Sequence, residues 1–131
     1  MEKIFNSLYP KHEKSKFSFK NNYIFDKRFA ESNRIRYRYP DRMPIICQRV
    51  GTNIPKIDKS KYLVPSDLTF GQFMYVIRKR INLEPEMGLY MFVGEGSCIP
   101  NNTSLIGRVY DDFRDKDGFL YINYSGENTF G

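Results

Sequence analysis

Residues 61–73 read KYLVPSDLTFGQF, and this stretch joins a strand to a well-marked helix start. Its first four residues predict a strand, which Pro65 ends because proline cannot donate a hydrogen bond to a sheet. Thr69 is a good helix N-cap, and Gln72 follows three residues later, as a capping box requires. A strand that passes almost directly into a capped helix predicts a domain that combines both kinds of element.

The helix that begins after Thr69 carries a clear apolar stripe. Phe73, Ile77 and Ile81 recur at intervals of four residues, which places them on one face of a helix. The cations of residues 78–80 follow at its end, where positive charge suits the helix dipole. Residues 89–93 then predict a third strand, so this helix is expected to cross between strands.

The C-terminal third predicts a short helix and a last strand. Residues 104–110 are expected to form the helix, with Thr103 as its cap. The Asp117-Gly118 pair is a turn signal. Residues 119–124 are apolar nearly throughout, and such runs are typical of strands buried on both faces. The last strand is therefore expected to be central in the sheet.

Before residue 61 the chain predicts two helices and one strand. Residues 17–23 are expected to form a short helix, and residues 26–39 a longer one that ends before Pro40. The expected inward face of the longer helix holds Phe25, Phe29, Ile35 and Tyr39, with Lys27, Arg28, Arg34 and Arg38 mostly off it. Residues 43–50 are rich in β-branched side chains and predict a strand.

The order of these elements predicts the fold class. From residue 43 it runs strand, strand, helix, strand, short helix, strand, which suits an α+β fold of the β-grasp type, a four-stranded mixed sheet around a helix, with two extra N-terminal helices. We expect residues 1–16 to be a basic N-terminal arm and residues 17–131 to be one domain. Within it, residues 17–40 form a helical subdomain and residues 125–131 a polar C-terminal tail.

Composition excludes several classes of protein. The 131 residues are 40% hydrophobic, with 11 Phe, 10 Tyr and no Trp, which is enough for a core. No apolar run reaches the roughly 18 residues of a membrane helix, and the N-terminus is unlike a signal peptide, so the chain is expected to be cytoplasmic. Cys47 and Cys98 do not make a disulfide framework. No nucleophile–base pair or metal-ligand spacing stands out, so an enzyme and a cofactor are not expected.

The net charge of +6 lies entirely in the first 40 residues. These hold ten Lys/Arg and four Asp/Glu, whereas residues 41–131 hold eleven of each. The asymmetry indicates an acidic partner such as anionic lipid, an acidic peptide or nucleic acid. Arg34 to Tyr39 alternates cations with aromatics, as single-stranded RNA binders do, although a helix face accounts for the same spacing.

Several sequence motifs, spread from residue 35 to residue 131, are distinctive enough to compare with known families. They are IR at 35–36, YPDRMP at 39–44, KYLVPSDLT at 61–69, GQF at 71–73, IRKRI at 77–81, DKDGFLY at 115–121 and SGENTFG at 125–131. Together they resemble the autophagy-related ubiquitin-like modifiers, the family of the GABA-receptor-associated protein and the microtubule-associated protein light chains. The resemblance implies a ubiquitin-like β-grasp and a protein that is not an enzyme.

The resemblance also implies a conjugation chemistry. In this family an activating enzyme adenylates the terminal glycine carboxylate, and a conjugating enzyme passes it to the amine of phosphatidylethanolamine on autophagosomal membranes. By this resemblance Gly131 is the acyl donor, and Thr129 and Phe130 are read by the processing and conjugating enzymes. A cysteine protease removes a short extension in most members. No residue follows Gly131 here, so either the chain needs no processing or the sequence is the processed form.

The resemblance further implies a docking face for cargo receptors, whose peptides carry an aromatic residue, two variable residues and an aliphatic residue. Such a peptide adds a strand to the sheet edge at residues 61–64. The implied aromatic pocket is Glu31, Ile35, Pro44, Ile46, Lys61, Leu63 and Phe119. The implied aliphatic pocket is Tyr62, Val64, Pro65, Leu68, Phe73 and Val76. Arg42, Lys59 and Arg80 are expected to meet acidic residues that flank the motif.

Many of these residues also suit an ordinary core, but the Lys61-Tyr62 pair has no evident core role in the sequence. The arm contains Phe5 and Leu8 at the aromatic-x-x-aliphatic spacing, which leaves self-docking, membrane contact and disorder open for residues 1–16. The loop from Gly94 to Cys98 is longer than the corresponding loop of the family.

Three function classes remain: the lipid-conjugated modifier, a non-lipidated adaptor in trafficking or microtubule binding, and a nucleic-acid module. The first is favoured.

Overall fold

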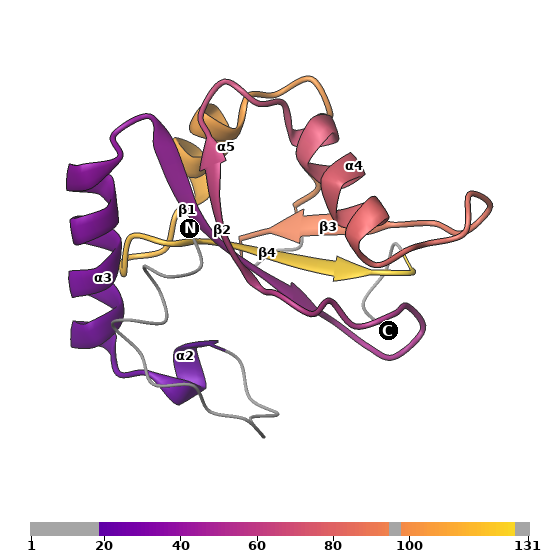
Figure 1. Ribbon diagram of the computed structural model, residues 1–131, viewed down its shortest axis with the longest axis horizontal. Helices are drawn as coiled ribbons and strands as arrows, with labels where there is room; N and C mark the ends of the chain where they lie inside the picture. Colours follow the sequence, from indigo (N-terminus) through magenta and orange to yellow (C-terminus); the bar gives the residue numbers. More distant parts are fainter. Residues whose placement is uncertain (1–18, 95–97, 128–131) are drawn as a thin grey trace.

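The computed structural model describes residues 19–94 and 98–127, which form a four-stranded sheet with helices on both faces (Figure 1). In chain order the elements are α2 (Phe19–Asn22), α3 (Phe25–Arg38), β1 (Arg42–Arg49), β2 (Lys61–Pro65), α4 (Phe70–Arg80), β3 (Tyr90–Val93), α5 (Ile106–Phe113) and β4 (Leu120–Ser125). Their bounds differ from the predicted ones by a few residues. The ubiquitin-like fold class predicted from the sequence is confirmed.

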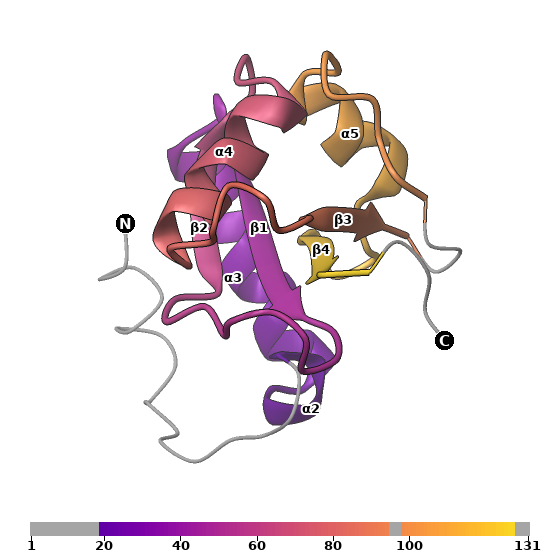
Figure 2. The same ribbon diagram turned by 90° about the vertical axis from the view of Figure 1, so that its right-hand side faces the viewer.

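The sheet is mixed and has the strand order β2-β1-β4-β3. β1 pairs with β2 antiparallel and with β4 parallel, while β3 pairs with β4 antiparallel. The last strand is therefore central, as its apolar run predicted, and β2 is an edge strand. Figures 1 and 2 show α4 and α5 on one side of the sheet and α2 and α3 on the other.

Each face of the sheet has its own hydrophobic cluster. The larger cluster, under α4 and α5, includes Ile45, Cys47, Phe70, Phe73, Ile77, Met91, Ile106, Leu120, Ile122 and Tyr124. The smaller cluster, under α2 and α3, consists of Phe19, Ile35, Ile46, Leu63 and Phe119. Because alternate side chains of a strand point to opposite faces, β1 and β2 contribute to both clusters.

The predicted capping box of α4 is confirmed. The Thr69 side chain accepts a hydrogen bond from the Gln72 backbone N–H at 3.1 Å, and Gln72 Oε1 accepts one from the Thr69 backbone N–H at 2.9 Å. Phe73, Ile77 and Ile81 are all buried, as the stripe predicted. The sequence between β2 and α4 thus specifies where the helix begins and which face it buries.

The predicted inward face of α3 is wrong in its first two turns. Phe25 and Phe29 are 43% and 44% exposed and stack on each other, with ring centroids 5.6 Å apart. The buried side chains of α3 are Arg28, Glu31, Ser32 and Ile35. The polar face turns inward because Arg28 finds a buried partner in Asp117, 2.5 Å away. Apolar periodicity alone could not reveal that partner.

The predicted cap of the C-terminal helix is also wrong. α5 begins at Ile106 after Leu105, whose side chain makes no capping hydrogen bond. The first turn is instead tied to the chain before α4, because the Ile106 N–H donates to the Leu68 carbonyl at 2.8 Å. Thr103 bonds locally to Asn101.

Along the described residues, none of the helices combines the length and the hydrophobicity that crossing a bilayer takes.

Candidate docking face along strand β2

Strand β2 divides the candidate site between the two faces of the sheet. Tyr62 and Val64 lie in the cluster under α4, whereas Leu63 lies in the cluster under α3. Of the residues implied for the aromatic pocket, Ile35, Ile46, Leu63 and Phe119 share that second cluster. The buried residues of the two predicted sets therefore belong to hydrophobic clusters on opposite faces of the sheet.

The aromatic set comes from four parts of the chain. α3 supplies Glu31 and Ile35, β1 supplies Pro44 and Ile46, β2 supplies Lys61 and Leu63, and Phe119 precedes β4. The strand register explains why the β1 and β2 residues of this set are neighbours. Pro44 stands opposite Leu63, and Ile46 stands opposite Lys61, across the β1–β2 pair. Lys61 is half-buried and the other six are buried.

Glu31 is the unusual member of this set. Its side chain is completely buried, and within the described part of the chain neither carboxylate oxygen has a hydrogen-bond partner. Burial raises the pKa of Glu31 from 4.5 to about 8, although the positive charges of Lys61 and Arg34 pull it down. A buried polar group without a partner is costly, so Glu31 is an acceptor that a ligand donor would satisfy.

The aliphatic set lies between β2 and α4. Tyr62, Val64 and Phe73 are buried at 8%, 4% and 1% exposure. Leu68 is half-buried and packs against the same cluster, while Pro65 is exposed and Val76 is 44% exposed. This set therefore has a buried floor and an exposed rim.

Tyr62 has a core role that the sequence did not reveal. Its ring packs edge-on against Phe73, with centroids 5.6 Å apart. Its hydroxyl is buried and has no hydrogen-bond partner among the described residues, and burial raises its pKa. The expectation that the Lys61-Tyr62 pair contributes nothing to a core is wrong for Tyr62.

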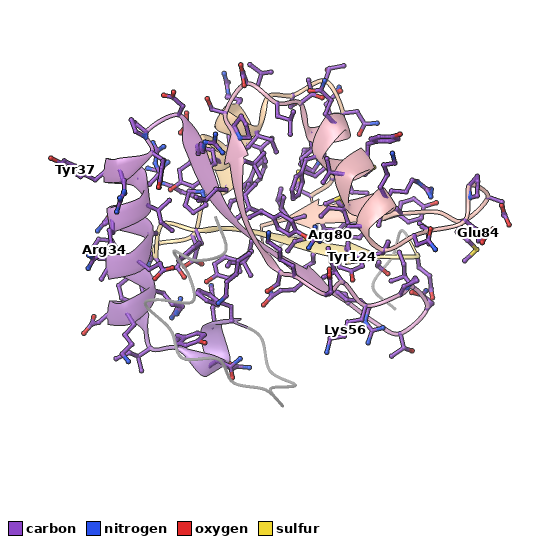
Figure 3. All side chains as sticks on the ribbon, viewed as in Figure 1. Arg34, Tyr37, Lys56, Arg80, Glu84 and Tyr124 are labelled. Carbon is purple, nitrogen blue, oxygen red and sulfur yellow. The ribbon has the colours of Figure 1, made fainter. Side chains whose placement is uncertain are left out.

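The three cations implied for acidic flanks differ in their surroundings. Arg80 is the last residue of α4 (Figure 3). Its Nε lies 3.1 Å from Asp58 Oδ1, so this guanidinium already has a carboxylate partner. The Lys59 ammonium lies 5.7 Å from the centre of the Tyr62 ring. Arg42 begins β1, opposite Pro65. Asp58 was missed by sequence reasoning, although an acid shortly before the edge strand was a visible signal.

The short N-terminal helix was predicted, but sequence reasoning missed that its residue Phe19 packs against the aromatic set. Phe19 of α2 is buried against Phe119, with ring centroids 5.2 Å apart in an edge-on arrangement. Its backbone N–H donates to Gln48 Oε1 at 2.9 Å, which ties α2 to β1. Tyr23 packs beside it at 5.1 Å. The aromatic residues of the predicted helix at 17–23 were the available signal.

The described start of the C-terminal tail is fastened beside the loop after β1. The Gly126 N–H donates to Asn53 Oδ1 at 3.3 Å, and Asn53 Nδ2 donates to Glu127 Oε2 at 2.5 Å. Thr129, Phe130 and Gly131 lie outside the described residues, as do Phe5, Leu8 and the whole arm. The tail therefore leaves the body at the end of a central strand.

Comparisons with known proteins agree with this arrangement. The family model described as "Autophagy protein Atg8 ubiquitin like" matches residues 27–131. The chain is 57% identical over 115 residues to Autophagy-related protein 8 of Mycosarcoma maydis, covering 87% of this chain and 96% of that protein. It is 55% identical over 114 residues to the Schizosaccharomyces pombe protein, covering 86% and 93%.

Solved structures show the same similarity in three dimensions. Trypanosoma brucei ATG8 has a TM-score of 0.77 and 42% identity, covering 91% of this chain and 100% of that chain. Plasmodium falciparum Atg8 in complex with a Plasmodium falciparum Atg3 peptide has a TM-score of 0.77 and 34% identity, covering 85% and 97%. With most of its length matched in sequence and in structure, the chain belongs to the Atg8 family of autophagy ubiquitin-like proteins.

Proposed function

We propose that this chain is a modifier that autophagy enzymes join, through the carboxylate of Gly131, to the amine of phosphatidylethanolamine on autophagosomal membranes. The chain is the substrate of that chemistry, and the activating and conjugating enzymes and a delipidating cysteine protease are its partners. The observation that carries the proposal is membership of the Atg8 family together with the SGENTFG tail. The central position of β4, which ends at Ser125 and leads straight into the tail, supports it.

The second half of the proposal is that the conjugated chain recruits cargo receptors through β2. An aromatic and an aliphatic residue three positions apart in an extended peptide point to opposite faces, because strand side chains alternate. The buried strand residues of the two candidate sets lie in clusters on opposite faces of the sheet, Leu63 in one and Tyr62 and Val64 in the other. A peptide strand added to β2 would therefore direct one of these side chains to each pocket.

Glu31 favours a tryptophan in the aromatic position. Both of its carboxylate oxygens lack a partner among the described residues, and an indole N–H is a donor without an acceptor function. Such a bond stabilises the ionised carboxylate, so binding should lower the pKa of Glu31 from about 8 and release a proton. Affinity for a tryptophan peptide should therefore rise with pH up to about 8, with Lys61, Arg34 and Tyr23 as the charged or titratable neighbours.

One structural neighbour supports peptide binding more directly. The Plasmodium falciparum Atg8 is held in a complex with an Atg3 peptide, and we propose that this chain binds a comparable peptide of its conjugating enzyme. A non-lipidated adaptor in trafficking or microtubule binding is the second candidate function. The basic first 40 residues favour it, because a positive surface suits an acidic partner.

The conjugation proposal is tested by incubating the chain with the family's activating and conjugating enzymes, ATP and phosphatidylethanolamine liposomes. A lipid conjugate should form with the wild type and not with Gly131→Ala. Absence of a conjugate from the wild type, or an equal yield from the variant, would favour the adaptor.

The docking proposal is tested by titrating an aromatic-x-x-aliphatic peptide against isotope-labelled protein. Chemical shift changes should concentrate on β2 and on the two flanking sets of residues. The other edge strand, β3, provides the control within the same sheet. Changes confined to β3 would place the site elsewhere and contradict the proposal.

A further inference from the structure

Two segments that supply residues of the candidate aromatic pocket, α3 and the turn before β4, are joined by one buried carboxylate, that of Asp117. Its side chain is completely buried. Asp117 Oδ2 accepts hydrogen bonds from the Arg28 guanidinium and from the Tyr121 hydroxyl, each at 2.5 Å. Asp117 Oδ1 accepts one from the Phe119 backbone N–H at 2.9 Å. One carboxylate therefore joins α3, the turn before β4 and the face of β4.

The backbone carbonyl of Asp117 makes a second hydrogen bond to α3. The Ser32 hydroxyl donates to the Asp117 carbonyl at 2.5 Å. The turn approaches α3 so closely that a Cβ at Gly118 would lie 2.2 Å from Ser32 Oγ. Because the turn and the helix touch at this point, a shift of one displaces the other.

Hydrophobic packing does not hold this part of α3. Of its buried side chains only Ile35 is apolar, and Phe25 and Phe29 remain 43% and 44% exposed. The first two turns of the helix are fixed instead by Arg28 and Ser32, which bond to Asp117. Arg28 also donates from Nε to the Tyr23 carbonyl at 2.9 Å, which ties in the segment between α2 and α3.

These contacts lie directly beside the aromatic pocket. Glu31 is three residues after Arg28 and adjacent to Ser32, and the Phe119 backbone N–H donates to the Asp117 carboxylate. Glu31 and Phe119 come from opposite walls of the pocket. Asp117 therefore links the helix that carries Glu31 to the segment that carries Phe119.

We propose that Asp117, with Arg28, is a positioning residue that sets the width of the aromatic pocket and so its selectivity for the aromatic residue of a peptide. The inference rests on the proposed docking function. The ion pair acts through geometry rather than through its charge, because Arg28 and Asp117 neutralise each other at 2.5 Å. The aliphatic pocket, on the other face of the sheet, does not depend on these contacts.

The test is a double-mutant cycle between protein and peptide. Three peptides are titrated by calorimetry: the parent with Trp-x-x-Leu, one with Trp→Ala and one with Leu→Ala. For the wild type we expect each alanine to weaken binding about 30-fold, as for a buried anchor. In Asp117→Asn the penalty for Trp→Ala should fall about tenfold, while the penalty for Leu→Ala stays as in the wild type.

A milder variant keeps the test decisive if Asp117→Asn folds poorly, and a second variant serves as its control. Tyr121→Phe removes one donor to Asp117 and leaves Arg28 in place, so its loss of Trp selectivity should be smaller but in the same direction. Asp112→Asn is the matched control, because Asp112 pairs with Arg108 at 3.3 Å on the exposed surface of α5. Circular dichroism monitors the fold of each variant.

The outcomes separate the inference from the function on which it rests. If the wild type does not distinguish Trp from Ala, the pocket itself is wrong and the inference falls with it. If the wild type does so and Asp117→Asn and Tyr121→Phe keep the same Trp penalty, only the positioning role is wrong. If Asp117→Asn lowers the binding penalties of Trp→Ala and Leu→Ala equally, the variant has lost structure in general, and the positioning role is also wrong.

Discussion

At the residue scale, Glu31 shows how burial changes the chemistry of a side chain. A surface glutamate would be ionised at neutral pH, whereas this one has a pKa raised to about 8 by burial. The folded state therefore favours the protonated form, and the unfolded chain does not. This contributes stability below the unfolded pKa of about 4.5 that is lost as the pH rises through about 8.

We predict that Glu31→Gln removes this pH dependence. The variant should gain stability relative to the wild type as the pH rises from about 4.5 to about 8, because the neutral amide has no proton to lose. Urea unfolding at a series of pH values measures the change. The exposed Glu84→Gln is the control and should leave the wild-type profile unchanged, and parallel profiles for Glu31→Gln and the wild type would contradict the prediction.

Asp58 is a second residue whose effect is specific and measurable. It holds Arg80 at 3.1 Å, in a pair that is largely exposed. Exposed pairs contribute about 0.2–1 kcal/mol, so this carboxylate is a modest competitor for any acidic group on a ligand.

We predict that Asp58→Asn strengthens binding of peptides with acidic flanks by about two- to fivefold, because Arg80 no longer has to leave a partner. A peptide with neutral flanks should bind as before. The comparison is made by calorimetry at low salt, and the gain should shrink at high salt. Equal changes for both peptides would argue against competition for Arg80.

At the element scale, the helix starts show which local rules were sufficient. The capping box at Thr69 consists of neighbouring residues and was readable from the sequence. The start of α5 depends on the Leu68 carbonyl, far away in the chain, and was not.

Replacing the two threonines tests this difference. Thr69→Ala should lower the free energy of unfolding by about 0.5–2 kcal/mol, because it leaves a backbone N–H of α4 without its acceptor. Thr103→Ala should cost less, since the hydrogen bonds of Thr103 within the described part of the chain go to nearby Asn101. Chemical denaturation measures the free energy of unfolding of both variants. A loss for Thr103→Ala that equals or exceeds the loss for Thr69→Ala would contradict this prediction and support Thr103 as a cap.

The contact between α3 and the turn before β4 also belongs to this scale. Gly118 has φ of 92°, and a Cβ there would meet Ser32. Gly51 has a similar φ of 78°, but among the described residues a Cβ there would have only Asn53 Oδ1 nearby, at 3.8 Å. The two glycines share a conformation and differ in the space around them.

We predict that Gly118→Ala destabilises the protein more than Gly51→Ala. The left-handed backbone costs about 1–2 kcal/mol at either site, and the clash with Ser32 adds to it only at Gly118. Urea unfolding gives the difference, and peptide titration should show weaker binding for Gly118→Ala alone. Equal effects of the two substitutions would mean that α3 is not held tightly against the turn.

At the scale of the whole molecule, the sequence was sufficient for the sheet and insufficient for the attached helices. Apolar runs identified the central strand β4, and the stripe of α4 identified the larger core, because both depend on neighbouring residues. α3 packs through Arg28 and Ser32 against Asp117, more than 80 residues later, which no local pattern reveals.

The candidate site shows the same division. Its residues were named by resemblance, and the buried strand residues of the two predicted sets, Leu63 on one side and Tyr62 and Val64 on the other, lie in clusters on opposite faces of the sheet. Their division into two faces follows from strand alternation around Leu63 and was within reach of the sequence. The orphaned carboxylate of Glu31 and the pairing of Arg80 with Asp58 depend on tertiary packing and were not.

The central claim is that one chain joins a membrane through its tail while β2 remains able to dock a peptide. The most direct measurement is flotation of a fluorescent Trp-x-x-Leu peptide with phosphatidylethanolamine liposomes, in the presence of the chain, the conjugating enzymes and ATP. We expect the peptide to float only when ATP is present, and Gly131→Ala to abolish its flotation while leaving the affinity of the chain for the peptide in solution unchanged. Flotation that persists with Gly131→Ala, or a conjugated wild type that leaves the peptide behind, would contradict it.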